Sequence, residues 1–195
     1  VCLLYGLDAA MLLLIDNPRL VRDTMDFFVE LQTRFGLAQI EAGADAIWFG
    51  DCLASSHMLS PAHYRDLAAE PARRVSENYK QAGGLVVMHA SEEGASLPIM
   101  AELGFSALSS GPGIDIAQAA EVCRGKCCFI GNLDPINVLE RGSVEHVVRE
   151  TARLMRVGKT LGGGYMFNMG EMTPRDTPIE NIRAAIQTAK SMAKY

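Results

Sequence analysis

The residues with the clearest chemical potential are His89, Asp51 and Glu171, because each one ends or follows an apolar run. His89 ends the segment "LVVMH", Asp51 follows "AIWFG", and Glu171 follows "YMFNMG". An imidazole beside a carboxylate can exchange protons with a substrate near neutral pH, and both groups are ligands for zinc. The sequence therefore offers an acid–base or metal site, provided that the fold brings these segments together.

Further polar residues stand at the ends of other apolar runs. Asn132 and Asp134 follow the run "CCFIG" and are candidate substrate contacts. In parallel α/β architectures, the carboxyl ends of the strands and the loops after them form the active face. A structural role stays open for two of these residues. Asp134 precedes Pro135 and fits a turn or cap residue as well as a substrate contact, and His89 could be a hydrogen-bonded structural histidine instead of a site residue.

The candidate residues are positioned by alternating helix and strand patterns, which are typical of βα units on a parallel sheet. Helix starts are marked by Asn17-Pro18, Ser60-Pro61, Asp115, Ser143 and Thr177-Pro178. A buried strand is predicted at 46–49, and further strands at 85–89, 105–109, 127–131 and 165–169. The helices that begin at these five marked positions are predicted to end near residues 40, 81, 123, 156 and 193. The glycines at 162–164 precede a strand, so they predict a turn and no phosphate cradle.

The composition bounds the class of protein. The chain has 195 residues, of which 49% are hydrophobic and 21% charged, as in an ordinary soluble domain. A net charge of −5 argues against nucleic acid as a partner, and no apolar run reaches the roughly 20 residues of a membrane span. Five cysteines without a visible secretory signal indicate reduced thiols. We therefore expect a single cytoplasmic domain.

Three motifs resemble, in order and spacing, the uroporphyrinogen decarboxylase superfamily: "GADAIWFGD…LSP", "GNLDP" and "GGGYMFNMGEMTPRDTPIENI". The resemblance implies that residues 1–195 are one domain, the C-terminal part of a (β/α)8 TIM-type barrel, with about five parallel strands and their helices. The N-terminal strands of that barrel are not in this sequence. Five strands cannot close an eight-stranded barrel, so two edges would remain free. Another chain could cover them, as in a homodimer.

The superfamily also contains zinc-dependent methyltransferases, which move methyl groups between methylcobamides and thiols such as coenzyme M. Their zinc is held by a His-x-Cys pair after the fifth strand and a cysteine after the eighth. His89 matches the histidine, whereas Ser91 and Glu171 stand at the cysteines. This branch implies a methylcorrinoid donor, held by a partner protein, and a zinc ion on His89 and Glu171 with Asp51 or Cys52 as third ligand. A metal-free mechanism would use His89 as acid/base and Glu171 to orient it.

Decarboxylases of the superfamily act on a tetrapyrrole in porphyrin biosynthesis, without metal or cofactor. Tyr5 matches their tyrosine, whereas Cys52 stands at their serine and Glu171 at their histidine. Tyr5 and Cys52 thereby join Asn132 and Asp134 as candidate substrate-binding residues. We favour the methyltransferase branch, because of His89 and the long loop "DCLASSHMLSP". A non-catalytic relative or an isolated half-barrel is a third alternative.

Overall fold

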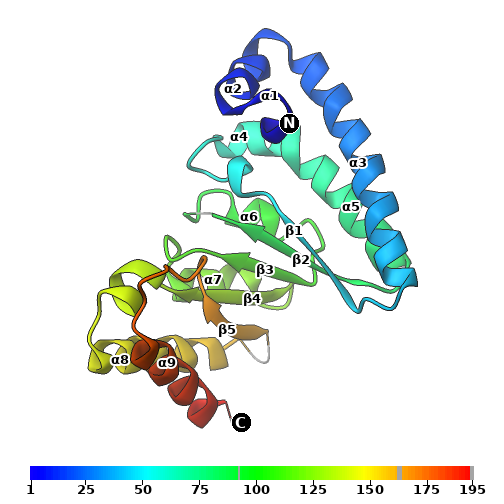
Figure 1. The fold of residues 1–195 in the computed structure, drawn as a ribbon. Coiled ribbons are helices and arrows are strands. Elements are labelled where there is room, and N and C mark those ends of the chain that lie inside the picture. The colour runs from blue at the N-terminus through cyan, green and yellow to red at the C-terminus, as the bar shows by residue number, and fades with distance from the viewer. Residues whose placement is uncertain (92, 162–163, 194–195) are drawn as a thin grey trace.

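The computed structural model of the chain describes residues 1–91, 93–161 and 164–193. Its centre is a sheet of five strands in the order β1-β2-β3-β4-β5, and all neighbouring strands are parallel (Figure 1). Each strand lies beside the one that precedes it in the chain, as expected for successive βα units. The predicted α/β class is therefore confirmed. The strands are β1 (Ala46–Gly50), β2 (Leu85–Ala90), β3 (Ala107–Ser110), β4 (Cys128–Leu133) and β5 (Tyr165–Met169).

Helices precede, connect and follow these strands. In chain order they are α1 (Cys2–Tyr5), α2 (Leu7–Asp16), α3 (Pro18–Glu41), α4 (Pro61–His63), α5 (Glu70–Gln81), α6 (Leu97–Met100), α7 (Ile116–Cys123), α8 (Val144–Lys159) and α9 (Ile179–Met192). A π-helical segment, Tyr64–Ala69, joins α4 to α5, and a second one, Pro135–Glu140, follows β4. Within the described residues, no helix is both long and apolar enough to cross a membrane.

Side-chain caps fix most of the predicted helix starts. Asn17, Ser60, Asp115 and Ser143 each accept a hydrogen bond from a backbone N–H of the first helical turn. The last helix departs from its prediction, since α9 begins after Pro178 without a side-chain cap. The turn predicted at the triple glycine cannot be compared, because residues 162 and 163 lie outside the described part of the chain.

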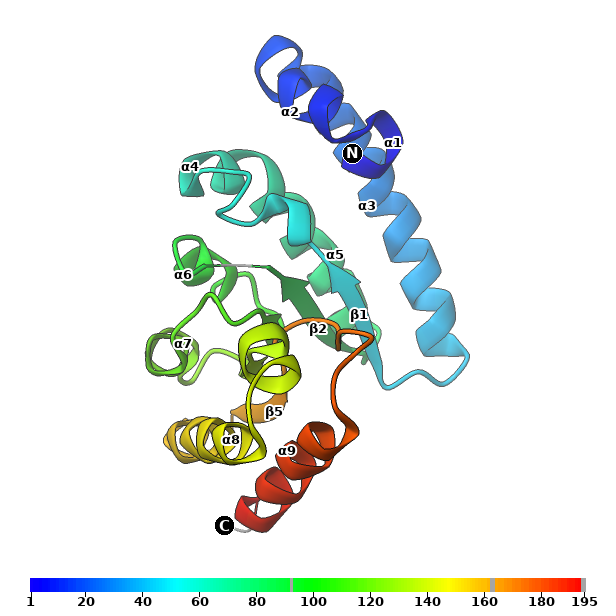
Figure 2. The same ribbon diagram turned by 60° about the vertical axis from the view of Figure 1, so that its left-hand side comes forward.

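The sheet has one face covered by helices and one open face. In β2 the side chains of Val86 and Met88 are fully buried, whereas Leu85 is 57% exposed. Because successive strand residues point to opposite faces, His89 shares the open face with Leu85. In Figure 2 the helices α5, α6, α7 and α8 form an arc around the strands, and the loop after β5 lies on the inner side.

The prediction that residues 46–49 form a buried strand was right about the strand and wrong about its burial. Only Ile47 is buried, and the Trp48 side chain is 54% exposed. β1 is an edge strand that pairs with β2 alone, and Trp48 lies on the open face. A parallel sheet normally has both faces covered, so the apolar run at 46–49 suggested a buried strand. One face of this sheet is open, and Trp48 lies on it.

Close packing between α3 and α5 depends on Gly36. A Cβ atom at Gly36 would lie 2.2 Å from Cε1 of Tyr79, whose buried ring is anchored by a hydrogen bond from its hydroxyl to the Gln32 carbonyl at 2.5 Å. Gly36→Ala should therefore lower the free energy of unfolding. The destabilisation by overpacking, about 1–3 kcal/mol, exceeds the stabilisation that alanine gives a helix relative to glycine, roughly 1 kcal/mol. Urea denaturation measures the change. Arg34→Ala, on the exposed side of α3, is the control and should change stability by less than about 0.5 kcal/mol.

Candidate functional site

His89 is held at the carboxyl end of β2 by three neighbours. Its Nδ1 atom lies 3.1 Å from Oγ of Ser109, and its Nε2 atom lies 3.4 Å from Oε2 of Glu171. The imidazole also stacks on the indole of Trp48, with ring centroids 5.4 Å apart and planes inclined by 24°. Strand register explains the contact with Ser109, because His89 lies opposite Ser109 of β3, and it places Trp48 two residues before Gly50, the partner of His89 in β1. The His89 side chain is 15% exposed, so it is sheltered and still reachable.

Glu171 comes from the loop after β5 and completes the cluster. Its Oε1 atom accepts a hydrogen bond of 2.8 Å from the Ser91 hydroxyl, while Oε2 faces His89. A glycine gives this carboxylate room, since a Cβ atom at Gly111 would lie 3.0 Å from Oε1. A continuous chain of contacts therefore runs from Ser109 through His89 and Glu171 to Ser91. The structure thus brings His89 and Glu171, two of the candidate site residues, into contact.

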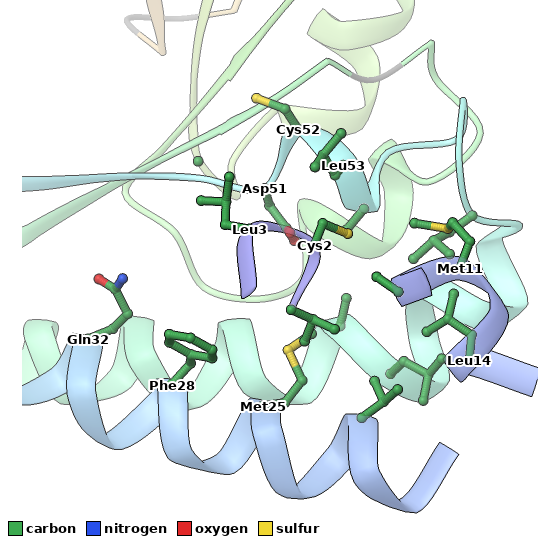
Figure 3. Close-up of a pocket in the computed structure, with 18 residues that line it drawn as sticks. Cys2, Leu3, Met11, Leu14, Met25, Phe28, Gln32, Asp51, Cys52 and Leu53 are labelled. Atoms are coloured by element: carbon green, nitrogen blue, oxygen red, sulfur yellow. The ribbon is translucent and has the colours of Figure 1, made fainter. Parts of the chain in front are cut away.

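The backbone of Asp51 lies beside this cluster, but its side chain points elsewhere. The Asp51 N–H donates to the His89 carbonyl at 2.7 Å, which ties the end of β1 to β2. The carboxyl group faces an apolar cavity of about 480 Å³ between α2, α3 and the loop after β1 (Figure 3). Burial there raises the pKa of Asp51 to about 6, although the hydrogen bond with the Tyr64 hydroxyl lowers it. Cys52 lines the same cavity.

Asn132 and Asp134 have structural partners. Asn132 is buried, and its Nδ2 atom donates to the carbonyls of Gly111 at 3.1 Å and Ile114 at 2.6 Å, so it secures the loop beneath Glu171. Asp134 caps the π-helical segment after β4, because its Oδ1 atom accepts from two backbone N–H groups of that segment. Burial raises the pKa of the Asp134 carboxyl, but the hydrogen bonds from Asn137 and Ile136 outweigh it, so the pKa lies below its usual value. Of the two alternatives for Asp134, the cap is the one that the structure shows.

Tyr5 is not part of the His89 cluster either. Its hydroxyl lies 3.1 Å from Oγ1 of Thr24, so the contact that it makes joins α1 to α3. The six predicted site residues other than Glu171 thus divide into His89 at the cluster, Asp51 and Cys52 at the adjacent cavity, and Tyr5, Asn132 and Asp134 in contacts that stabilise the fold.

Residues that the sequence did not single out complete the environment of His89. Trp48 and Ser109 both contact the imidazole, and Gly111 leaves space for Glu171. Ser109 could have been chosen from the sequence, since it ends a predicted strand as His89 does. Trp48 could have been found from the alternation of β1, because it lies two residues before Gly50 on the same face. The role of Gly111 depends on a residue 60 positions later, so no local pattern marks it.

The cluster does not fit the zinc ion that the methyltransferase branch implies. Protein zinc sites have at least three protein ligands, and sulfur-rich ones require thiolates. Across residues 1–91, 93–161 and 164–193, no third His, Cys, Asp or Glu joins His89 and Glu171 in a metal-binding group. The predicted third ligand fails because the Asp51 carboxyl faces the apolar cavity, and Cys52 forms no metal-binding group with His89 and Glu171 within the described residues. The Ser91 hydroxyl, which stands at a thiolate position, donates to Glu171 instead.

A parallel βα sheet with its polar cluster at the carboxyl ends of the strands is the arrangement found in barrel enzymes. The family model for uroporphyrinogen decarboxylase (URO-D) matches residues 2–192. The chain belongs to the uroporphyrinogen decarboxylase family, as the resemblance predicted.

Individual relatives agree with this assignment. Uroporphyrinogen decarboxylase from Chlorobium luteolum is 29% identical over 186 residues, which cover 92% of this chain and 51% of that protein. The corresponding protein from Carboxydothermus hydrogenoformans is 25% identical over 180 residues, or 91% of this chain and 49% of that protein. A methyltransferase from Methanosarcina mazei shares the fold, with a TM-score of 0.82 at 22% identity over 94% of this chain and 53% of that chain. The chain thus spans about half the length of these relatives.

Proposed function

We propose that this site transfers a methyl group from a methylcorrinoid, carried by a partner protein, to a small nucleophilic acceptor. The observation that carries the proposal is the contact between His89 Nε2 and Glu171 Oε2 at the carboxyl ends of the strands, where the resemblance places the groups that activate the acceptor. The methyltransferase from Methanosarcina mazei has the same fold, which is compatible with this chemistry.

His89 is the acceptor-activating base in this proposal. When the acceptor attacks the methyl group, its X–H proton must leave, and the imidazole accepts it at Nδ1 in place of the contact with the Ser109 hydroxyl, while Nε2–H donates to Glu171. Glu171 orients the ring and stabilises the imidazolium that forms, while Ser91 holds the other carboxylate oxygen in place. Trp48 covers one face of the ring and limits its rotation. A methylcorrinoid would supply the methyl group in electrophilic form.

Tetrapyrrole decarboxylation is the second candidate, and the curated relatives favour it. The proteins from Chlorobium luteolum and Carboxydothermus hydrogenoformans are both uroporphyrinogen decarboxylases. Within the described residues, Tyr5 is the one match to the three residues of that branch, and its hydroxyl lies against Thr24. These departures make decarboxylation the weaker candidate.

A pair of assays separates the two candidates. The full chain is incubated with methylcobalamin and a thiol, and the visible absorption of the corrinoid reports loss of the methyl group. In parallel, the chain is given uroporphyrinogen, and the product is analysed for lost carboxyl groups. We expect demethylation of the corrinoid that depends on both protein and thiol. Decarboxylation without demethylation would reverse the order of the candidates, and inactivity in both assays would favour a non-catalytic relative.

A further inference from the structure

We infer that the His89 cluster is a metal-free proton-transfer site and that a single substitution, Ser91→Cys, is sufficient to convert it into a site for Zn²⁺ or Co²⁺. The inference rests on the proposed function for the role of the cluster. Its test measures metal binding alone, so either the function or the inference can fail without the other.

The atoms of the cluster that could bind a metal already have hydrogen-bond partners. The Ser91 hydroxyl donates its proton to Glu171 Oε1 at 2.8 Å, and Glu171 Oε2 faces His89 Nε2 at 3.4 Å. The other imidazole nitrogen lies 3.1 Å from the Ser109 hydroxyl, which is itself buried. A metal ion would have to displace these contacts and would gain only one nitrogen and one carboxylate in return. Two protein ligands are fewer than zinc sites use.

The side chain at position 91 decides whether the cluster favours a hydrogen bond or a metal ion. A serine hydroxyl is a neutral donor at physiological pH, so it stabilises the Glu171 carboxylate and does little for a cation. A cysteine at this position is nearly the same size, and a metal-bound thiol is deprotonated and strongly favoured by zinc. Ser91→Cys therefore replaces the hydroxyl that donates a hydrogen bond to Glu171 with a thiolate that can bind a metal ion.

The backbone already directs the side chains of residues 89, 91 and 171 to one place. His89 lies near the end of β2 and Ser91 directly follows that strand, and the side chains of both residues point to Glu171. Glu171 contacts both of them from the loop after β5, at 3.4 Å and 2.8 Å. Ligand atoms that lie about 2.0–2.3 Å from a common zinc ion in tetrahedral geometry are roughly 3.5 Å apart. His89, Cys at 91 and Glu171 would thus supply nitrogen, sulfur and oxygen, with a fourth position open.

The experiment is a Co²⁺ titration of wild type, Ser91→Cys and Ser91→Ala, followed by competition with Zn²⁺. Even outer partners of a metal ligand change affinity by about 10- to 100-fold, so a new thiolate ligand should raise affinity by at least roughly 100-fold. We expect Ser91→Cys to bind one Co²⁺ per chain and to show a thiolate-to-cobalt absorption band. Wild type and Ser91→Ala should show neither at the same concentrations.

The chain has five native cysteines, so the double variant His89→Ala/Ser91→Cys is the essential control. Loss of binding in the double variant places the metal at the cluster. Ser91→His, which supplies an imidazole in place of the thiol, repeats the test if the cysteine variant does not fold. Stoichiometric, equally tight binding by wild type would overturn the inference, as would binding by Ser91→Cys that is no tighter than wild type or does not need His89.

Discussion

Replacing His89 with glutamine is expected to lower the rate of methyl transfer by about 100- to 10,000-fold, which is the usual contribution of a general base. Glutamine keeps a polar group of similar length beside Ser109 and Glu171 but cannot accept the acceptor's proton. The rate constant with saturating acceptor should therefore fall, while the stability of the chain changes little. Stopped-flow absorption of the corrinoid measures the rate.

A matched control is His146→Gln, because His146 lies on α8 and its backbone N–H is bound to the Ser143 cap, away from the cluster. This control should keep the wild-type rate. If His89→Gln is as active as wild type, His89 is the hydrogen-bonded structural histidine that the sequence also allowed. Glu171→Gln should retain more activity than His89→Gln, since an amide can still hydrogen-bond to the imidazole.

Replacing Asp51 with asparagine is expected to stabilise the protein above pH 6 and to leave it almost unchanged near pH 4. Burial raises the pKa of Asp51 from 3.8 to about 6, so between these values the folded chain binds a proton that the unfolded chain has lost. Wild-type stability should therefore fall as pH rises through this window and level off above it. A pKa shift of this size changes the free energy of unfolding by at most about 3 kcal/mol. Asparagine cannot ionise, so it removes the contribution of Asp51 to the pH dependence of stability.

Denaturation by urea at intervals between pH 4 and pH 8 measures this difference. Asp134 supplies a control of opposite sign, since its hydrogen bonds from Asn137 and Ile136 lower its pKa overall. The contribution of Asp134 is present at neutral pH and is lost on acidification, so Asp134→Asn should be most destabilising at neutral pH. Equal pH profiles for wild type and Asp51→Asn would show that the Asp51 carboxyl is hydrated.

The sequence was informative where local physics decides the structure. All five strands were found, because each one is an apolar run bounded by glycine or polar residues, and β5 has the predicted limits. Caps such as Asn17 and Asp115 marked helix starts correctly. Burial of β1 was misjudged, because an edge position depends on which strands are present beside it and not on the residues of β1 itself.

The candidate site was predictable in part for the same reason. Strand ends that meet at one edge of a parallel sheet brought His89 and Glu171 together, although they are 82 positions apart. The direction of the Asp51 side chain was not predictable, since it comes just after β1, where the regular alternation of the strand ends. The structural roles of Asn132 and Asp134 depend on hydrogen bonds that only the folded loops define.

The stacking of Trp48 on His89 gives the cluster an intrinsic fluorescent probe. Trp48 is the only tryptophan of the chain, and its ring centroid lies 5.4 Å from that of the imidazole. Indole emission responds to the charge and polarity of its immediate surroundings, and no second tryptophan contributes a background. Ultraviolet-excited fluorescence therefore reports on His89 in the unlabelled protein, so that the arrival of an acceptor or a proton at the imidazole can be followed directly.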